Sequence, residues 1–214
     1  MTRFKTLAIA ICAATLCTAV VNHASAKTLS IRIDKSNSNP LMAQPEFAIG
    51  AANYVAQRIL TLKAEDKVSL SSFGARSNAS NLLENTYVLD RKLRAKELAS
   101  AIAEYIKTIP SDIEKGQRAT NIVSLLEFGN GFDCANAGEV IVITDGIEAS
   151  DYIEADELIS GKKSLPGADV DLSGCSVFFY GLGAGLSGKD VKSVRTQWQR
   201  WMKQSGANFD HWIP

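Results

Sequence analysis

The sequence predicts an α/β fold in which a mostly parallel sheet is flanked by helices, a three-layer and doubly wound arrangement. Short apolar segments alternate along the chain with longer segments whose apolar residues recur every three or four positions. Two short segments, residues 139–144 and 175–180, are dominated by apolar residues, as is typical of parallel strands covered on both faces. Parallel neighbours require crossover connections, and these are right-handed in nearly all proteins.

The first part of this pattern begins with residues 29–33, which predict a short strand that ends at Asp34. A helix is expected from Glu46, because apolar residues recur at helical spacing from there. They are Phe47, Ala51, Tyr54, Val55, Ile59 and Leu62. Residues 66–74 and 85–89 predict two further strands.

The next helix is predicted to start at Asp90 as its N-cap and to stop at Pro110. Its apolar stripe consists of Leu98, Ile102, Tyr105, Ile106 and Ile109. A short helix over residues 121–128 precedes the strand at 139–144, and Asp151 with Glu154 suits a later helix start.

The last helix is expected to follow a capping box formed by Ser187 and Asp190. Its buried stripe is predicted to comprise Val191, Val194, Trp198, Trp201 and Met202. Residues 209–213 predict a final strand. Ser30 and Arg32 interrupt the apolar residues of strand 29–33, so an unusual neighbour must cover that face of the strand.

Residues 1–26 have the features of a secretory signal peptide. Two basic residues precede the uncharged stretch 7–21, and Ala24-Ser-Ala26 provides a cleavage site. The alternative, a membrane anchor, is disfavoured because about fifteen apolar residues are fewer than the roughly twenty that span a bilayer. We therefore expect a periplasmic or secreted protein, one domain over residues 27–214, and no membrane span after cleavage.

Net charge argues against a nucleic-acid partner. The chain has 23 basic and 23 acidic residues, and removal of Arg3 and Lys5 with the signal peptide leaves a net charge of 21 − 23 = −2. Cys134 and Cys175 remain in a chain directed to a compartment where disulfides persist, so a bridge between them is expected. It would close a loop of about 41 residues and stabilise the fold by up to about 4 kcal/mol. A metal site at these cysteines lacks further ligands.

Oxygen-bearing side chains gather where strands are expected to end. Asp34, Ser36 and Ser38 occupy alternate positions after the first strand, Thr120 precedes a helix, and Asp145 closes the strand at 139–144. In such sheets ligands bind beyond the carboxyl ends of the strands. Two carboxylates and three hydroxyls suit a small hard cation such as Mg²⁺ or Mn²⁺.

The order of these residues resembles the metal-ion-dependent adhesion site of the von Willebrand A family, whose pattern is Asp-x-Ser-x-Ser, a distant Thr and a distant Asp. Residues 66–73, 139–146 and 177–183 also resemble strands of that Rossmann-like fold. The resemblance covers most of residues 27–214. It implies that the three hydroxyls contact the cation, while the two carboxylates act largely through water or hydrogen bonds. An acidic side chain of a protein partner would then complete the coordination, so the resemblance implies recognition with no catalytic residues.

Other interpretations of the same residues stay open. Singly, each candidate residue is equally suited to a turn or a helix cap. A metal-dependent hydrolase could use Asp34 or Asp145 as a base. Gly183, Gly185 and Gly188 fit the Gly-x-Gly-x-x-Gly spacing of dinucleotide-binding oxidoreductases, with Asp210 about twenty residues further on. That motif comes so late in the chain that only one strand follows it.

Overall fold

The computed structural model describes residues 26–75, 84–111, 116–129 and 131–213. Residues 1–25 of the expected signal peptide lie outside these ranges. Within the ranges, no helix is both long and apolar enough to cross a bilayer.

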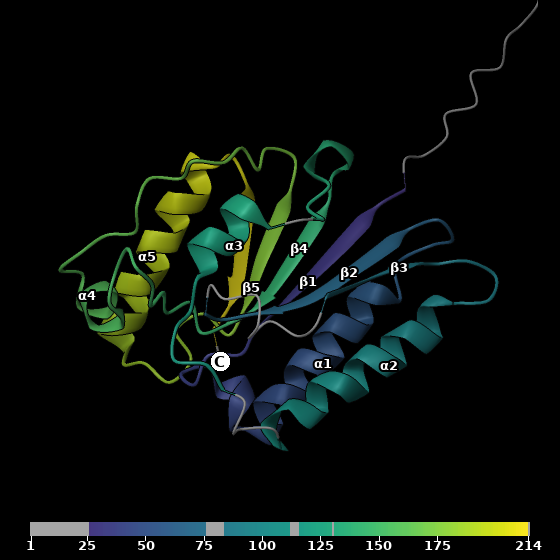
Figure 1. The fold of residues 1–214 in the computed structure, drawn as a ribbon, viewed down its shortest axis with the longest axis horizontal. Coiled ribbons are helices and arrows are strands. Elements are labelled where there is room, and N and C mark those ends of the chain that lie inside the picture. Colours follow the sequence, from purple (N-terminus) through teal and green to yellow (C-terminus); the bar gives the residue numbers. More distant parts are fainter. Residues whose placement is uncertain (1–25, 76–83, 112–115, 130, 214) are drawn as a thin grey trace, which may run out of the picture.

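Six strands form one sheet in the order β3-β2-β1-β4-β5-β6 (Figure 1). Neighbouring strands are parallel except for β2 and β3, which run antiparallel. The strands are β1 (Thr28–Asp34), β2 (Lys67–Phe73), β3 (Glu84–Val88), β4 (Glu139–Ile143), β5 (Ser176–Tyr180) and β6 (Asn208–Trp212). The predicted α/β class with a mostly parallel sheet is confirmed.

Helices cover both faces of the sheet (Figure 1). On one face lie α1 (Pro45–Ile59) and α2 (Ala95–Thr108). On the other lie α3 (Ile122–Phe128), α4 (Ala155–Ser160) and α5 (Gly188–Gln204). Two short 3-10 turns, η1 (Pro40–Met42) and η4 (Cys134–Asn136), lie in the connections.

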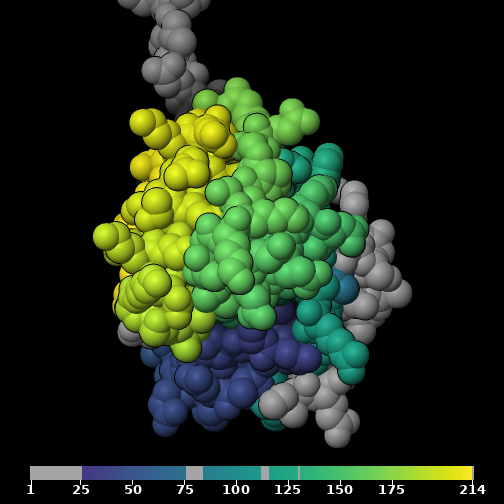
Figure 2. All heavy atoms as spheres, turned by 90° about the vertical axis from the view of Figure 1, so that its left-hand side faces the viewer, coloured from purple at the N-terminus to yellow at the C-terminus, as the bar shows by residue number. Residues whose placement is uncertain are grey.

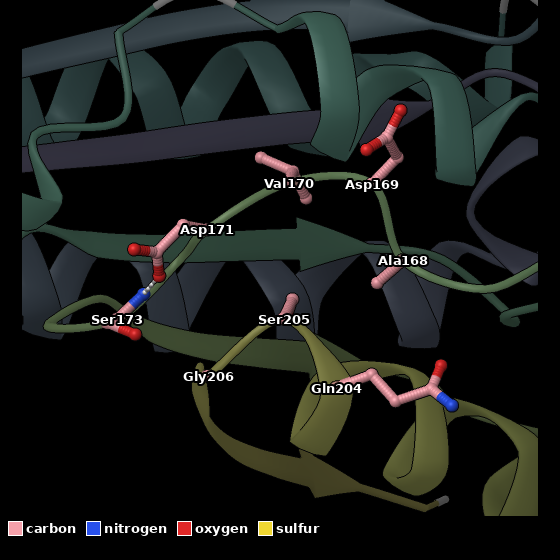
Figure 3. Close-up of a pocket in the computed structure, with 8 residues that line it drawn as sticks. All are labelled: Ala168, Asp169, Val170, Asp171, Ser173, Gln204, Ser205 and Gly206. Atoms are coloured by element: carbon pink, nitrogen blue, oxygen red, sulfur yellow. Dashed lines mark hydrogen bonds between the residues drawn. The ribbon is translucent and has the colours of Figure 1, made fainter.

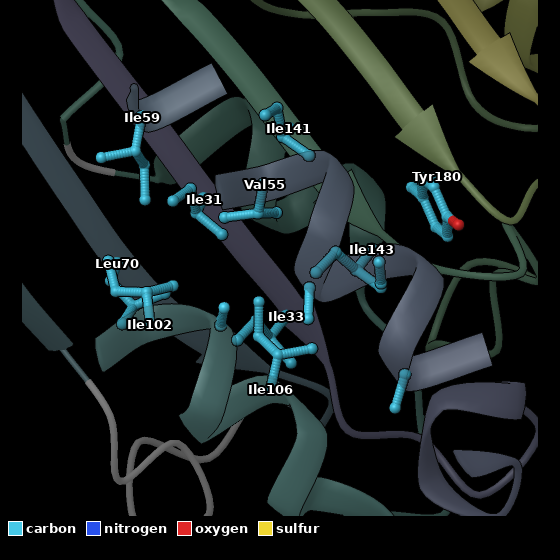
Figure 4. Close-up of a cluster of buried hydrophobic side chains, with 14 of the residues drawn as sticks. Ile31, Ile33, Val55, Ile59, Leu70, Ile102, Ile106, Ile141, Ile143 and Tyr180 are labelled. Carbon is cyan, nitrogen blue, oxygen red and sulfur yellow. The ribbon is translucent and has the colours of Figure 1, made fainter. Parts of the chain in front are cut away.

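Each face of the sheet has its own apolar core. Figure 4 shows the core under α1 and α2, where Ile141 and Ile143 of β4 meet Val55. The intervening residues Val140 and Val142 belong to the opposite core. Because successive side chains of a strand point to opposite faces, a strand covered on both faces is apolar at every position, which explains the run in β4.

A loop covers the polar face of β1. Ser30 Oγ donates to the carbonyl of Gly131 at 2.5 Å, and Arg32 Nη1 donates to Ser69 Oγ at 3.1 Å. The Arg32 guanidinium, 2 % exposed, lies 5.1 Å from the ring centroid of Phe132. Gly131 has φ +86°, and a Cβ there would lie 2.9 Å from Ser69 Oγ. The unusual neighbour expected for this strand is thus the loop between α3 and β4.

The disulfide between Cys134 and Cys175 is present, with the two Cα atoms 4.4 Å apart. Cys175 directly precedes β5, and Cys134 lies in the connection that leads into β4. The bridge therefore lies at the amino ends of these parallel strands, opposite the end where Asp34 and Asp145 lie. This prediction is confirmed.

Two predicted helix caps are wrong. Asp90 Oδ1 accepts from the backbone N–H groups of Lys92 and Leu93, so it closes a turn, and α2 begins only after Arg94. Ser187 does precede α5, but its hydroxyl donates to Asp190 Oδ2 at 2.6 Å and makes no cap hydrogen bond to the backbone. The Asp90 oxygen is used by a local turn, whereas the Ser187 hydroxyl points its hydrogen at Asp190 instead of accepting from the first turn of α5.

Candidate functional site

The loop that follows β1 brings three of the predicted residues together. Asp34 is fully buried; its Oδ1 accepts from the Ser36 N–H at 2.8 Å and its Oδ2 from the Thr144 hydroxyl at 2.7 Å. Ser36 Oγ lies 3.3 Å from Ser38 Oγ. Ser36 is buried and Ser38 is exposed, so the cluster extends from the interior to the surface.

Asp145 lies at the end of the neighbouring strand β4 and is also fully buried. Its Oδ1 accepts from the Ile147 N–H at 2.9 Å, whereas its Oδ2 has no hydrogen-bond partner among the described residues. The next residue, Gly146, has φ +75°, and a Cβ there would lie 2.3 Å from Leu182 Cδ1. Trp198 Nε1 donates to the Gly146 carbonyl at 2.7 Å, so the turn that carries Asp145 is closely packed.

Thr120 is joined to both of these loops through the backbone. Its N–H and carbonyl pair with Ala149, at 2.9 and 3.0 Å. Three residues earlier, the Gln117 carbonyl accepts from Asn37 at 2.8 Å, and the Gln117 N–H donates to the Lys35 carbonyl at 2.8 Å. The five predicted residues therefore lie on three adjacent loops at the carboxyl ends of the parallel strands.

Burial gives the two carboxyl groups unusual acidities. Burial and the charge of Asp145 raise the pKa of Asp34 to about 7. The hydrogen bonds from Thr144 and Ser36 act in the opposite direction and lower it. Burial also raises the pKa of Asp145 to about 6, opposed by the hydrogen bond from the Ile147 N–H and by the nearby Ser38 hydroxyl. That hydroxyl does not come within hydrogen-bonding geometry of Oδ2. Two like charges thus face each other in an environment with little water, which disfavours their joint ionisation.

The five side chains of the site offer oxygen atoms as possible metal ligands. In the described part of the chain, no group of three or more His, Cys, Asp and Glu side chains could hold a metal ion. The site itself offers two carboxylates, and its remaining polar side chains are hydroxyls. Such a set is unsuited to soft metals and matches the preferences of small hard cations.

Asn39 contributes to the site in a way that the sequence pattern did not reveal. An Asn followed by Pro is common in turns, but the Asn39 side chain is 1 % exposed. Its Nδ2 donates to the carbonyls of Asp34 at 2.8 Å and Ile143 at 3.1 Å, and its Oδ1 accepts from the Leu41 N–H at 3.2 Å. It therefore ties the ends of β1 and β4 together beneath the serines.

The glycine motif at residues 183–188 leads from β5 into α5, of which Gly188 is the first residue. The Gly183 N–H donates to the Asp145 carbonyl at 2.7 Å, so this loop packs against the turn that carries Asp145. Asp210 lies in β6, where its Oδ1 accepts from the His211 N–H at 2.8 Å.

A separate cavity of about 350 Å³ lies elsewhere (Figure 3). Its lining comes from residues 168–171, Ser173 and residues 204–206. These residues precede β5 and β6, so the cavity lies at the opposite end of the sheet and contains none of the predicted site residues.

Figure 2 shows the green and yellow C-terminal half covering most of one side, with purple and blue N-terminal segments along its lower border.

Comparison with known proteins gives only distant similarities. No protein-family model and no curated protein matches this chain. Among solved structures, proximal thread matrix protein 1 from the mussel byssus has a TM-score of 0.44 and 14% identity over 79% of this chain. The conserved hypothetical protein BatB from Bacteroides thetaiotaomicron has a TM-score of 0.43 and 17% identity, with 87% of this chain and 90% of that chain covered.

An aerotolerance-related membrane protein from Bacteroides fragilis, carrying multiple mutations to serine, has a TM-score of 0.46 and 15% identity. That match covers 87% of this chain and 91% of the other. The match to the mussel protein spans only 41% of its length.

Proposed function

We propose that this is an exported binding protein that holds Mg²⁺ or Mn²⁺ at Asp34, Ser36, Ser38, Thr120 and Asp145. In this proposal the cation binds an acidic side chain of a protein partner. The observation that carries the proposal is Asp145 Oδ2, a fully buried carboxylate oxygen that lacks a hydrogen-bond partner among the described residues. A buried carboxylate without a partner is costly, and a cation would compensate its charge.

The surroundings of this oxygen support the proposal. Asp34 and Asp145 repel each other when both are ionised, and the Ser36 and Ser38 hydroxyls lie beside them. A divalent cation would neutralise both carboxylates, and hydroxyl ligands would leave it able to attract a further carboxylate. The exposed Ser38 lies where such a group could arrive from solvent. The order of residues found in von Willebrand A domains supports the same role.

Calorimetric titration of the purified, metal-stripped protein with Mg²⁺ and Mn²⁺ tests the cation site. We expect saturable binding that Asp34→Ala and Ser36→Ala abolish. Asp171→Ala and Ser173→Ala change the same residue types on the loop at the far end of the sheet, and should leave binding unchanged. An unmodified protein that binds neither cation would contradict the cation site.

The acidic partner is tested separately with an array of Glu- and Asp-containing peptides and matched Gln and Asn peptides. We expect binding only to acidic peptides and only with Mg²⁺ or Mn²⁺ present. Metal-dependent turnover of a phosphoester or peptide substrate that Asp34→Ala abolishes would instead favour the hydrolase interpretation.

A further inference from the structure

Glu148 is a buried carboxylate that the five-residue site does not include. Its side chain is fully buried, and its Oε2 accepts from the backbone N–H groups of Ile122 at 2.7 Å and Val123 at 3.1 Å. Its Oε1 is buried without a hydrogen-bond partner among the described residues. Asn121, the residue in the N-cap position of α3, makes no side-chain cap hydrogen bond. A distant loop therefore supplies the cap that a local side chain usually provides.

The cap that Glu148 provides lies close to Thr120. Ile122 and Val123 lie two and three residues after Thr120 in the chain, and Ala149, the neighbour of Glu148, exchanges both backbone hydrogen bonds with Thr120. The pair Glu148 and Ala149 thus holds the backbone at Thr120 itself and just after it. Asp145 lies only three residues before Glu148 on the same turn, so the link from one predicted metal-site residue to another is short.

Capping alone does not account for a carboxylate at this place. Burial raises the pKa of Glu148 to about 7, opposed by the nearby Ser150 hydroxyl and by the hydrogen bonds from the α3 backbone. A serine or aspartate at the local cap position would satisfy the same N–H groups without removing a charge from water. Unlike a local cap, Glu148 adds a side-chain connection between the first turn of α3 and the turn that carries Asp145, beside the backbone hydrogen bonds of Ala149 with Thr120.

We propose that Glu148 is a positioning residue of the cation site, which sets the Thr120 hydroxyl relative to Asp145 by holding the first turn of α3. This inference rests on the proposed cation function. Residues that orient metal ligands through hydrogen bonds typically change metal affinity by about 10- to 100-fold when removed.

Three variants separate position from charge. Glu148→Gln keeps an acceptor oxygen at the same reach, Glu148→Asp keeps the charge but shortens the side chain, and Glu148→Ala removes both. Glu154→Ala is the matched control, because Glu154 is an exposed residue that caps α4. The measurements are Mn²⁺ affinity, the thermal midpoint in a chelator, and amide hydrogen exchange at Ile122 and Val123 without metal.

We expect Glu148→Ala and Glu148→Asp to weaken Mn²⁺ binding by about tenfold or more and to speed exchange at the two amides. Glu148→Gln should stay within about threefold of the unmodified protein, since it still accepts from both N–H groups. The control should lower the thermal midpoint without changing Mn²⁺ affinity. If the unmodified protein binds Mn²⁺ and folded Glu148→Asp and Glu148→Ala bind it equally well, the positioning role is wrong and the cation site stands. Absence of Mn²⁺ binding to the unmodified protein would overturn both.

Discussion

The Thr144 hydroxyl donates to Asp34 Oδ2 across 2.7 Å and so joins the carboxyl ends of β4 and β1, 110 residues apart in the chain. Both side chains are fully buried. This hydrogen bond stabilises the ionised form of Asp34 against the effects of burial and of Asp145. Thr144 directly precedes Asp145, so one hydrogen bond fixes the spacing of both carboxylates.

Replacement of Thr144 by Val tests this relationship, because it keeps the shape of the side chain and removes the donor. We expect the pKa of Asp34 to rise further and Mn²⁺ affinity at pH 7 to fall by about tenfold. Titration calorimetry at pH 7 and pH 8.5 measures the effect. The loss should be smaller at pH 8.5, where Asp34 is ionised in both proteins. An equal loss at both values would point instead to the Gly146 N–H, which donates to the same hydroxyl at 3.0 Å and would lose that acceptor.

Raised carboxyl pKa values predict an unusual dependence of stability on pH. The pKa of Asp34 is about 7 and that of Asp145 about 6 in the folded protein, compared with 3.8 for an ordinary Asp. Between about pH 4 and 7 the folded state therefore holds protons that the unfolded chain has released. The free energy of unfolding then falls as the pH rises through this window.

We expect the metal-free protein to be more stable at pH 5 than at pH 7.5, by on the order of 4 kcal/mol from these two groups. The raised pKa of Glu148, about 7, adds to the same trend. Urea unfolding at the two pH values checks this. Asp145→Asn should stabilise the metal-free protein at pH 7.5 and reduce the dependence on pH. Mg²⁺ should reverse the trend in the unmodified protein, since protons compete with the cation for the same oxygens. A pH dependence that Asp145→Asn leaves unchanged would point to other groups.

Loss of Arg32 should destabilise the fold without reaching the cation site. Arg32→Ala would leave a cavity under Phe132 and remove the donor to Ser69, at a cost of about 2–4 kcal/mol. Chemical denaturation provides the measurement. The exposed Arg200 is the comparison, and Arg200→Ala should change the free energy of unfolding by less than about 0.5 kcal/mol.

Removal of the disulfide should affect stability and leave the site intact. The bridge spans a separation of 41 residues and lies at the far end of the sheet. For Cys134→Ser with Cys175→Ser we expect a loss of about 2–4 kcal/mol in the free energy of unfolding. Mn²⁺ affinity under native conditions should remain within about twofold. A large change in affinity would show that the loop between α3 and β4 communicates with the cation site.

Several elements were predictable because their cause is local. The apolar run of β4 follows from burial on both faces, and the buried residues of α5, among them Trp198 and Trp201, follow from helical periodicity. The cap at Asp90 and the capping box at Ser187 were wrong because these side chains form hydrogen bonds with other nearby groups. The sequence does not show which of the possible partners is preferred.

The sequence alone determined the fold class, the pairing of Cys134 with Cys175, and the placement of Asp34 and Asp145 at the same end of a parallel sheet. Strand periodicity and the direction of parallel strands suffice for the fold class and for the two carboxylates. The disulfide follows because two cysteines remain after the expected signal peptide. Only the tertiary structure decided that the loop carrying Phe132 covers Arg32 and that Glu148 caps α3 from 26 residues away. Those contacts join polar groups from separate loops, and no periodic pattern encodes which buried donor will meet which acceptor.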